Sequence, residues 1–194
     1  MKYQIQVVLP FLSLFLAVIN LNAQEKVEEE YRVKESEVPV QAQKWIHGTF
    51  GEMKGIKWYY EKSSGKASYE AKLKSDRKVY SIEFDTMGVI EDVEQKYEWN
   101  ELESDIKTNL TKYFRSNYIK YKIIKIQKQY VGTATDLKNY IRQNEKEGIT
   151  VNYEIEFHGK TQTENELWEC LFSSNGELLQ KKKIILKPAN NLEF

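Results

Sequence analysis

The chain has 194 residues, of which 29 are Lys or Arg and 29 are Asp or Glu, so its formal net charge is 0. This balance excludes the strong positive field with which proteins bind nucleic acid through its phosphates. The single cysteine, Cys170, excludes an internal disulfide bond, so the fold must depend on its hydrophobic core.

Residues 1–23 have the pattern of a secretory signal peptide. Lys2 gives a positive start, residues 5–19 are mostly apolar, and Ala23 is a small residue at a cleavage site. The apolar stretch is short for a membrane span, and Pro10 would kink a spanning helix. We therefore expect cleavage near Ala23 and a periplasmic or secreted protein without a stable membrane anchor. The alternative is an uncleaved N-terminal anchor.

The next segment, residues 24–37, is acidic and poor in large apolar side chains, which is typical of a flexible leader. Apolar side chains then recur every four residues at Val38, Ala42, Ile46 and Phe50. This spacing predicts an amphipathic helix over residues 38–50.

Short alternating segments follow the first helix. In residues 80–85, for example, Tyr80, Ile82 and Phe84 alternate with polar side chains, which predicts a strand with one apolar face. Turn residues separate this strand from its neighbours. We expect a four-stranded antiparallel meander with one apolar and one polar face. Its strands are residues 56–61, 69–74, 80–85 and 89–95.

The pattern then starts again, which indicates an internal repeat. A second helix has apolar residues at Leu102, Ile106, Leu110 and Phe114, and four strand-like segments follow it. We expect an α+β fold of two repeats, each a helix plus a four-stranded antiparallel meander, with the helices packed on one face of the sheet. The repeats would span residues 38–98 and 99–187, with an insertion at residues 132–148 and a tail at residues 188–194.

The order of these pieces resembles a known family. Each repeat has a Tyr-Glu-x-x-apolar strand, then an aromatic-x-apolar-x-Phe strand, a Gly turn and another strand. This is similar to the exported PepSY-like proteins of Bacteroidetes, whose fold is likened to the β-lactamase inhibitor protein. The resemblance implies helices packed on an antiparallel sheet and a non-catalytic binding or inhibitory module. It implies no catalytic residues, and the insertion departs from the family pattern.

The polar face of the sheet is the candidate binding surface. Its carboxylates alternate with lysines, and one aromatic side chain on it could anchor an interface. The candidate residues are Lys57, Tyr59, Glu61, Glu70, Glu83, Glu154, Glu156 and Glu169.

Several motifs could carry chemistry but have simpler interpretations. Ser63 and Lys66 match a Ser-x-x-Lys pattern, although they fall in a hairpin turn and not at a helix start. His47 and His158 are too far from other functional groups in the sequence to indicate a catalytic pair. Cys170 alternates with apolar residues, so we expect a core position. No metal site and no cofactor are predicted.

Three functions are compatible with these patterns. The first is an exported, non-catalytic binding or inhibitory module whose partner is an envelope or extracellular protein and not a nucleic acid. The second is a carrier of a small apolar ligand between helices and sheet. The third is a small hydrolase that uses carboxylates or the Ser63 and Lys66 pair.

Overall fold

The computed structural model describes residues 24–63 and 65–185. The expected signal peptide and the expected tail, residues 188–194, lie outside the described residues. None of the helices in the described ranges is long and apolar enough to cross a membrane.

The described chain forms nine strands, three α-helices and two short 3-10 helices. In chain order they are β1 (Gln24–Val33), η1 (Glu35–Glu37), α1 (Val40–Phe50), β2 (Lys57–Ser63), β3 (Lys66–Ser75), β4 (Lys78–Asp85), β5 (Ile90–Tyr97), η2 (Trp99–Glu101), α2 (Ser104–Asn117), β6 (Lys120–Val131), α3 (Ala134–Gln143), β7 (Thr150–Lys160), β8 (Asn165–Ser173) and β9 (Leu178–Ile185).

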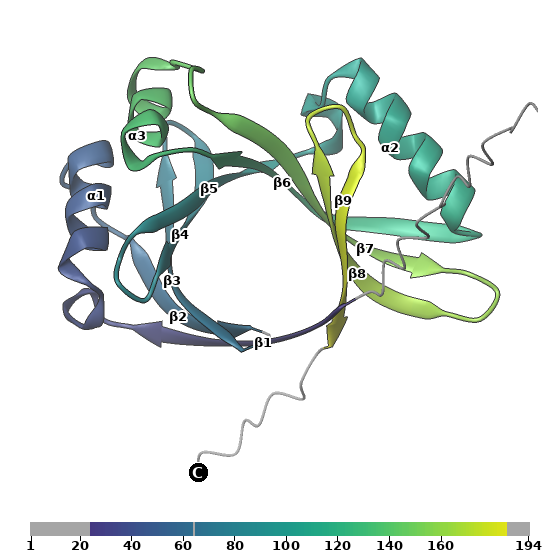
Figure 1. The fold of residues 1–194 in the computed structure, drawn as a ribbon, viewed down its shortest axis with the longest axis horizontal. Helices are drawn as coiled ribbons and strands as arrows, with labels where there is room; N and C mark the ends of the chain where they lie inside the picture. Colours follow the sequence, from purple (N-terminus) through teal and green to yellow (C-terminus); the bar gives the residue numbers. More distant parts are fainter. Residues whose placement is uncertain (1–23, 64, 186–194) are drawn as a thin grey trace, which may run out of the picture.

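The nine strands form one closed barrel in sequence order (Figure 1). Strands β2 to β9 pair antiparallel, each with the next, so β5 and β6 join the two predicted meanders into one sheet. Strand β1 then closes the sheet: it pairs antiparallel with β2 and parallel with β9. Each of the nine described strands therefore has a neighbour on both sides, which protects the sheet from pairing with another chain.

This architecture corrects the expected fold class. The expected α+β fold, two repeats of a helix plus a four-stranded meander with the helices packed on one face of the sheet, is wrong. The described molecule is mostly sheet, and its nine strands form one barrel. The strands themselves lie where alternation predicted them. The flexible leader is also wrong for residues 24–33, which form β1. Acidic β1 lies beside the lysine-rich segment of β9, where Glu25 is in register with Lys183.

The helices lie outside the barrel, α1 and α3 on one side and α2 on the other (Figure 1). They cover the apolar faces of the strands and create two hydrophobic cores. In the first core, Ile46 of α1 packs with Trp58 and Phe84, and Leu137 brings in α3 from the predicted insertion. In the second, Phe114 of α2 packs with the strands β7 and β8. The polar strand faces therefore point into the barrel.

A glycine turn between two strands contacts the helix in each half of the barrel, α1 in the first half and α2 in the second. Gly88 and Gly176 both have positive φ angles, 83° and 81°, in the β4–β5 and β8–β9 turns. A Cβ atom on Gly88 would lie 2.8 Å from Pro39 Cβ, and one on Gly176 would lie 2.9 Å from Asn109 Cβ. Glycine is required at both turns because of the backbone conformation and the contact with the helix.

Candidate functional site: the acidic interior of the barrel

The predicted binding residues share one face of the sheet, and that face forms the interior wall of the barrel. Glu70 is in register with Tyr59 on one side and with Glu83 on the other. In the second half, Glu156 is in register with Glu169. Lys57, at the start of β2, is exposed and in register with Lys72. Alternation thus identified the shared face, but the face is curled inward and is not an open docking surface.

The interior contains a cavity of about 530 Å³. A barrel slightly wider than eight strands has room for a small ligand beside its side chains. The lining carries seven carboxyl groups and three lysine ammonium groups, so acidic groups outnumber basic ones. The lining residues are Lys26, Glu61, Ser63, Lys66, Ala67, Ser68, Glu83, Glu91, Asp92, Glu94, Gln129, Glu154, Glu169, Gln180 and Lys182.

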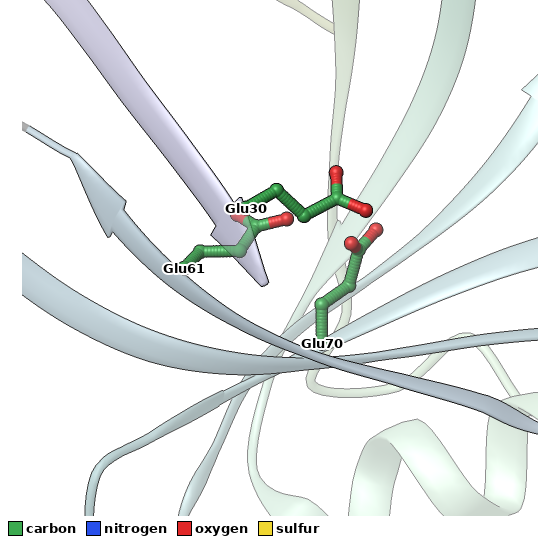
Figure 2. Close-up of side chains that lie close together, drawn as sticks. All are labelled: Glu30, Glu61 and Glu70. Carbon is green, nitrogen blue, oxygen red and sulfur yellow. The ribbon is translucent and has the colours of Figure 1, made fainter. Parts of the chain in front are cut away.

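Three carboxyl groups from β1, β2 and β3 form the first acidic cluster, Glu30, Glu61 and Glu70 (Figure 2). One oxygen atom of each lies within 4.8 Å of the others. The cluster has a cation of its own, because Lys72 Nζ lies 3.0 Å from Glu30 Oε2 and 2.8 Å from Glu70 Oε2. Burial acts to raise the pKa of Glu70, but hydrogen bonds from Glu61 and Lys72 outweigh it and hold the pKa below its usual value.

The second acidic cluster consists of Glu154, Glu156 and Glu169, again with one oxygen of each within 4.8 Å of the others. Lysines compensate two of the three carboxylates. Lys125 Nζ lies 3.0 Å from Glu156 Oε1, whereas Lys26 and Lys182 both pair with Glu169. Burial and then the negative charge of Glu169 raise the pKa of Glu154 to about 8.

Strand β5 adds two carboxyl groups that the sequence analysis did not select. Burial raises the pKa of Asp92, and the charges of Glu83 and Glu154 raise it further. Glu94 is only 5% exposed, and burial and the charge of Glu154 raise its pKa in the same way. Both residues alternate with Val93 in a predicted strand, so the signal was present. Glu30 was missed for another reason, because its segment was interpreted as a flexible leader.

The remaining sequence candidates are not brought together into a catalytic group. His47 Nε2 lies 2.6 Å from Glu35 Oε1, and this hydrogen bond raises the pKa of His47. His158 lies on another element, β7, and is exposed. Cys170 is a fully buried core residue, as expected, and burial raises its pKa to about 12. Ser63 and Lys66 are paired across the β2–β3 turn and belong to the cavity lining.

Fold and site together define a class of protein: a helix-covered β-barrel whose interior is an acidic, polar cavity in place of an apolar core. No family model and no curated protein matches the sequence.

Solved structures of Bacteroides proteins are similar to this chain. A DUF2874 family protein from Bacteroides ovatus ATCC 8483 has a TM-score of 0.52 and 11% identity, covering 75% of this chain and 87% of its own. A DUF2874 family protein from Bacteroides uniformis ATCC 8492 has the same TM-score and identity, and the match covers 75% of this chain and 89% of that protein. A protein described as BLIP-like, from Bacteroides fragilis NCTC 9343, has a TM-score of 0.49 and 15% identity, covering 78% and 90%.

At these identities the DUF2874 structures show the fold and nothing more. They support the resemblance to Bacteroidetes proteins at the level of architecture. The PepSY-like part of that resemblance stays a prediction, since no finding tests it.

Proposed function

We propose that this protein is a non-catalytic binding module that takes up a positively charged group in the acidic interior of its barrel. One observation carries the proposal: a cavity of about 530 Å³ lined by seven carboxyl groups but three lysines. Carboxyl groups that face one another in an enclosed cavity are screened less by solvent and attract a cation more strongly than carboxylates on an open surface. The signal-like pattern of residues 1–23 supports action outside the cytoplasm.

The lining also supports the non-catalytic part of the proposal. Within the described residues, it contains no histidine or cysteine. Its serine beside a lysine, Ser63 with Lys66, lies in a hairpin and not at the start of a helix, where a nucleophile of the Ser-x-x-Lys kind belongs.

The structure favours a polar ligand over the apolar one considered from sequence. Between helices and barrel, where an apolar ligand would lie, side chains such as Ile46, Phe84 and Phe114 are fully buried against their neighbours. The polar space is inside the barrel instead. A protein partner would then contribute a basic side chain or an amino terminus, and a free ligand would be a small cation.

Calorimetry at low ionic strength tests the proposal with calcium chloride, spermidine and lysine amide as separate probes. We expect at least one to bind with one-to-one stoichiometry and to bind more weakly as salt is added. Lysine amide represents a protein-borne group and the other two represent free cations. Sodium citrate is the matched anionic control. If none of the three cations binds, the proposed function is wrong.

A further inference from the structure

Glu94 of β5 is a buried acidic residue of the cavity wall. Its side chain is only 5% exposed, yet it belongs to the lining of the interior cavity. Within residues 24–63 and 65–185, no basic side chain forms an ion pair with Glu94 and no group donates a hydrogen bond to its carboxyl oxygens. Burial of a carboxyl group without such a partner is unfavourable, so Glu94 points to a positively charged group that the chain itself does not provide.

Asp92 and Glu154 extend the same wall. Asp92 lies two residues before Glu94 in β5. Gln129 donates to its Oδ2 atom at 2.9 Å, whereas its Oδ1 atom is buried without a hydrogen-bond donor among the described residues. Glu154 lies on β7, on the far side of β6. Both residues line the cavity, and neither forms an ion pair in the described part of the chain. Three acidic groups on β5 and β7 therefore face the cavity without an ion pair of their own.

The lysines of the lining serve other positions. Lys26 and Lys182 both pair with Glu169 of β8, and Lys66 lies at the β2–β3 turn. The wall formed by β5, β6 and β7 is therefore the part of the cavity where a bound cation adds the missing charge.

The spacing of these three groups does not suit a single metal ion. Oxygen ligands must all lie within about 2.6 Å of a bound calcium ion. The two sets of three acidic side chains that approach one another within 4.8 Å contain neither Asp92 nor Glu94. Two residues of β5 span about 7 Å, and Glu94 and Glu154 lie on strands separated by β6, which places their backbones about 10 Å apart. Positive groups spaced along one ligand can reach all three, whereas one point charge cannot.

The cavity also has the size of a site for a small organic molecule. Its volume of about 530 Å³ lies within the range of about 300–1,000 Å³ that is usual for such sites. The groups on its β5–β7 wall are mostly hydrogen-bond acceptors, and an ammonium group combines three donors with a positive charge.

We propose that the cavity binds a linear organic cation with at least two ammonium groups separated by short methylene segments, the chemical class of the polyamines. Asp92 and Glu94 contact one ammonium group, and Glu154 contacts the next. The inference rests on the proposed function and specifies its ligand. Burial and neighbouring negative charges raise the pKa values of all three acids, and a bound cation favours their charged forms. Binding should therefore release protons.

The test compares putrescine, calcium chloride and butylamine by calorimetry at near-neutral pH and constant ionic strength. Putrescine and calcium carry the same charge, but putrescine divides it between two separate ammonium groups, and butylamine has a single ammonium group. We expect one putrescine per chain, bound at least tenfold more tightly than calcium or butylamine. Repeating the putrescine titration in two buffers of different ionisation enthalpy measures the expected release of protons.

Variants locate the site. Glu94→Gln and Glu154→Gln should each weaken putrescine binding at least tenfold, because each removes a charged acceptor. The matched control is Glu145→Gln, which removes the same charge from an exposed position between α3 and β7, outside the cavity lining. It should change the affinity less than twofold. Circular dichroism checks that each variant is folded.

Each other result overturns a defined part. If putrescine binds no more tightly than calcium or butylamine, the ligand class is wrong and the proposed function stands. Failure of all cationic probes, spermidine and lysine amide included, rejects both. Putrescine binding without proton release, or binding that Glu70→Gln abolishes and Glu94→Gln leaves intact, rejects the assignment to β5 and β7. Should Glu94→Gln fail to fold, Glu154→Gln and the comparison of probes on the unchanged protein still decide.

Discussion

The two halves of the barrel share a backbone plan but treat interior negative charge differently. Each half consists of four consecutive strands, β2 to β5 or β6 to β9, with a helix outside and a glycine turn against that helix. Inside, one lysine bridges two carboxylates of the first acidic cluster. In the second, three lysines pair with Glu156 and Glu169, and Glu154 is left over.

The two halves are therefore more alike in how their apolar side chains pack than in how their interior charges are paired. Apolar side chains must fill a fixed space between helix and sheet, so each half has the same pattern. Interior charges face a polar cavity, where water, protons or a ligand can compensate them, so they are free to diverge. Carboxyl groups without an ion pair among the described residues lie in both halves, Asp92 and Glu94 on β5 and Glu154 on β7, so the two halves form the candidate binding cavity together.

The largest expected effect comes from equivalent core positions, Phe84→Ala in the first half and Phe172→Ala in the second. Both side chains are fully buried, and each substitution should lower the free energy of unfolding by about 3–5 kcal/mol. Because the halves share one closed sheet, each variant should still unfold in a single transition, observed by urea titration with circular dichroism and tryptophan fluorescence. Two transitions, of which one is shifted, would show that the halves fold independently.

The glycine turns should give intermediate effects. We expect Gly88→Ala to lower the free energy of unfolding by about 2–3 kcal/mol, because of its positive φ angle and a contact of 3.0 Å with the backbone nitrogen of Ala42. Gly176→Ala should cost about 1–2 kcal/mol, since its close contact is the side chain of Asn109. Gly55→Ala is the control, with positive φ and open space around it. Equal losses at all three positions would contradict the packing argument.

The smallest effects on stability come from substituting the interior carboxyl groups Glu154 and Glu70, and the two effects should have opposite signs. Both are measured with EDTA present, so that no bound metal ion contributes. The pKa of Glu154 is raised from 4.5 to about 8, so the folded protein loses stability as pH rises through this window. Glu154→Gln removes that loss and should stabilise the protein by about 1–2 kcal/mol at pH 8, with no gain near pH 4. Urea titrations at both pH values measure the difference.

Glu70→Gln should do the reverse. The pKa of Glu70 is lowered, so its charged form stabilises the fold above pH 4.5, and this contribution is lost as pH falls through the folded pKa. The variant should be less stable by about 1–2 kcal/mol at pH 8, and the difference should shrink in acid. If both Gln variants shift stability in the same direction, the contrast between the two halves is wrong.

Much of the local structure was predictable. Four-residue spacing located α1 and α2, and alternation located eight of the nine strands and the residues that share their polar face. Strand β1 was missed because acidic residues without apolar alternation resemble a leader. The available signal for β1 was its negative charge, which complements the lysines of β9 beside which it lies. The sequence could not indicate Gln127 of β6, a buried side chain whose Oε1 atom has no hydrogen-bond donor among the described residues, since this property exists only in the folded structure.

The sequence by itself determined the elements and which side chains lie on the same face of each strand, since periodicity depends on backbone geometry alone. Only the tertiary structure decided that the polar face becomes an interior. Alternation is the same in a flat sheet and in a barrel. The choice between them depends on twist accumulated over nine strands and on backbone pairing of β1 with β9, at opposite ends of the described chain.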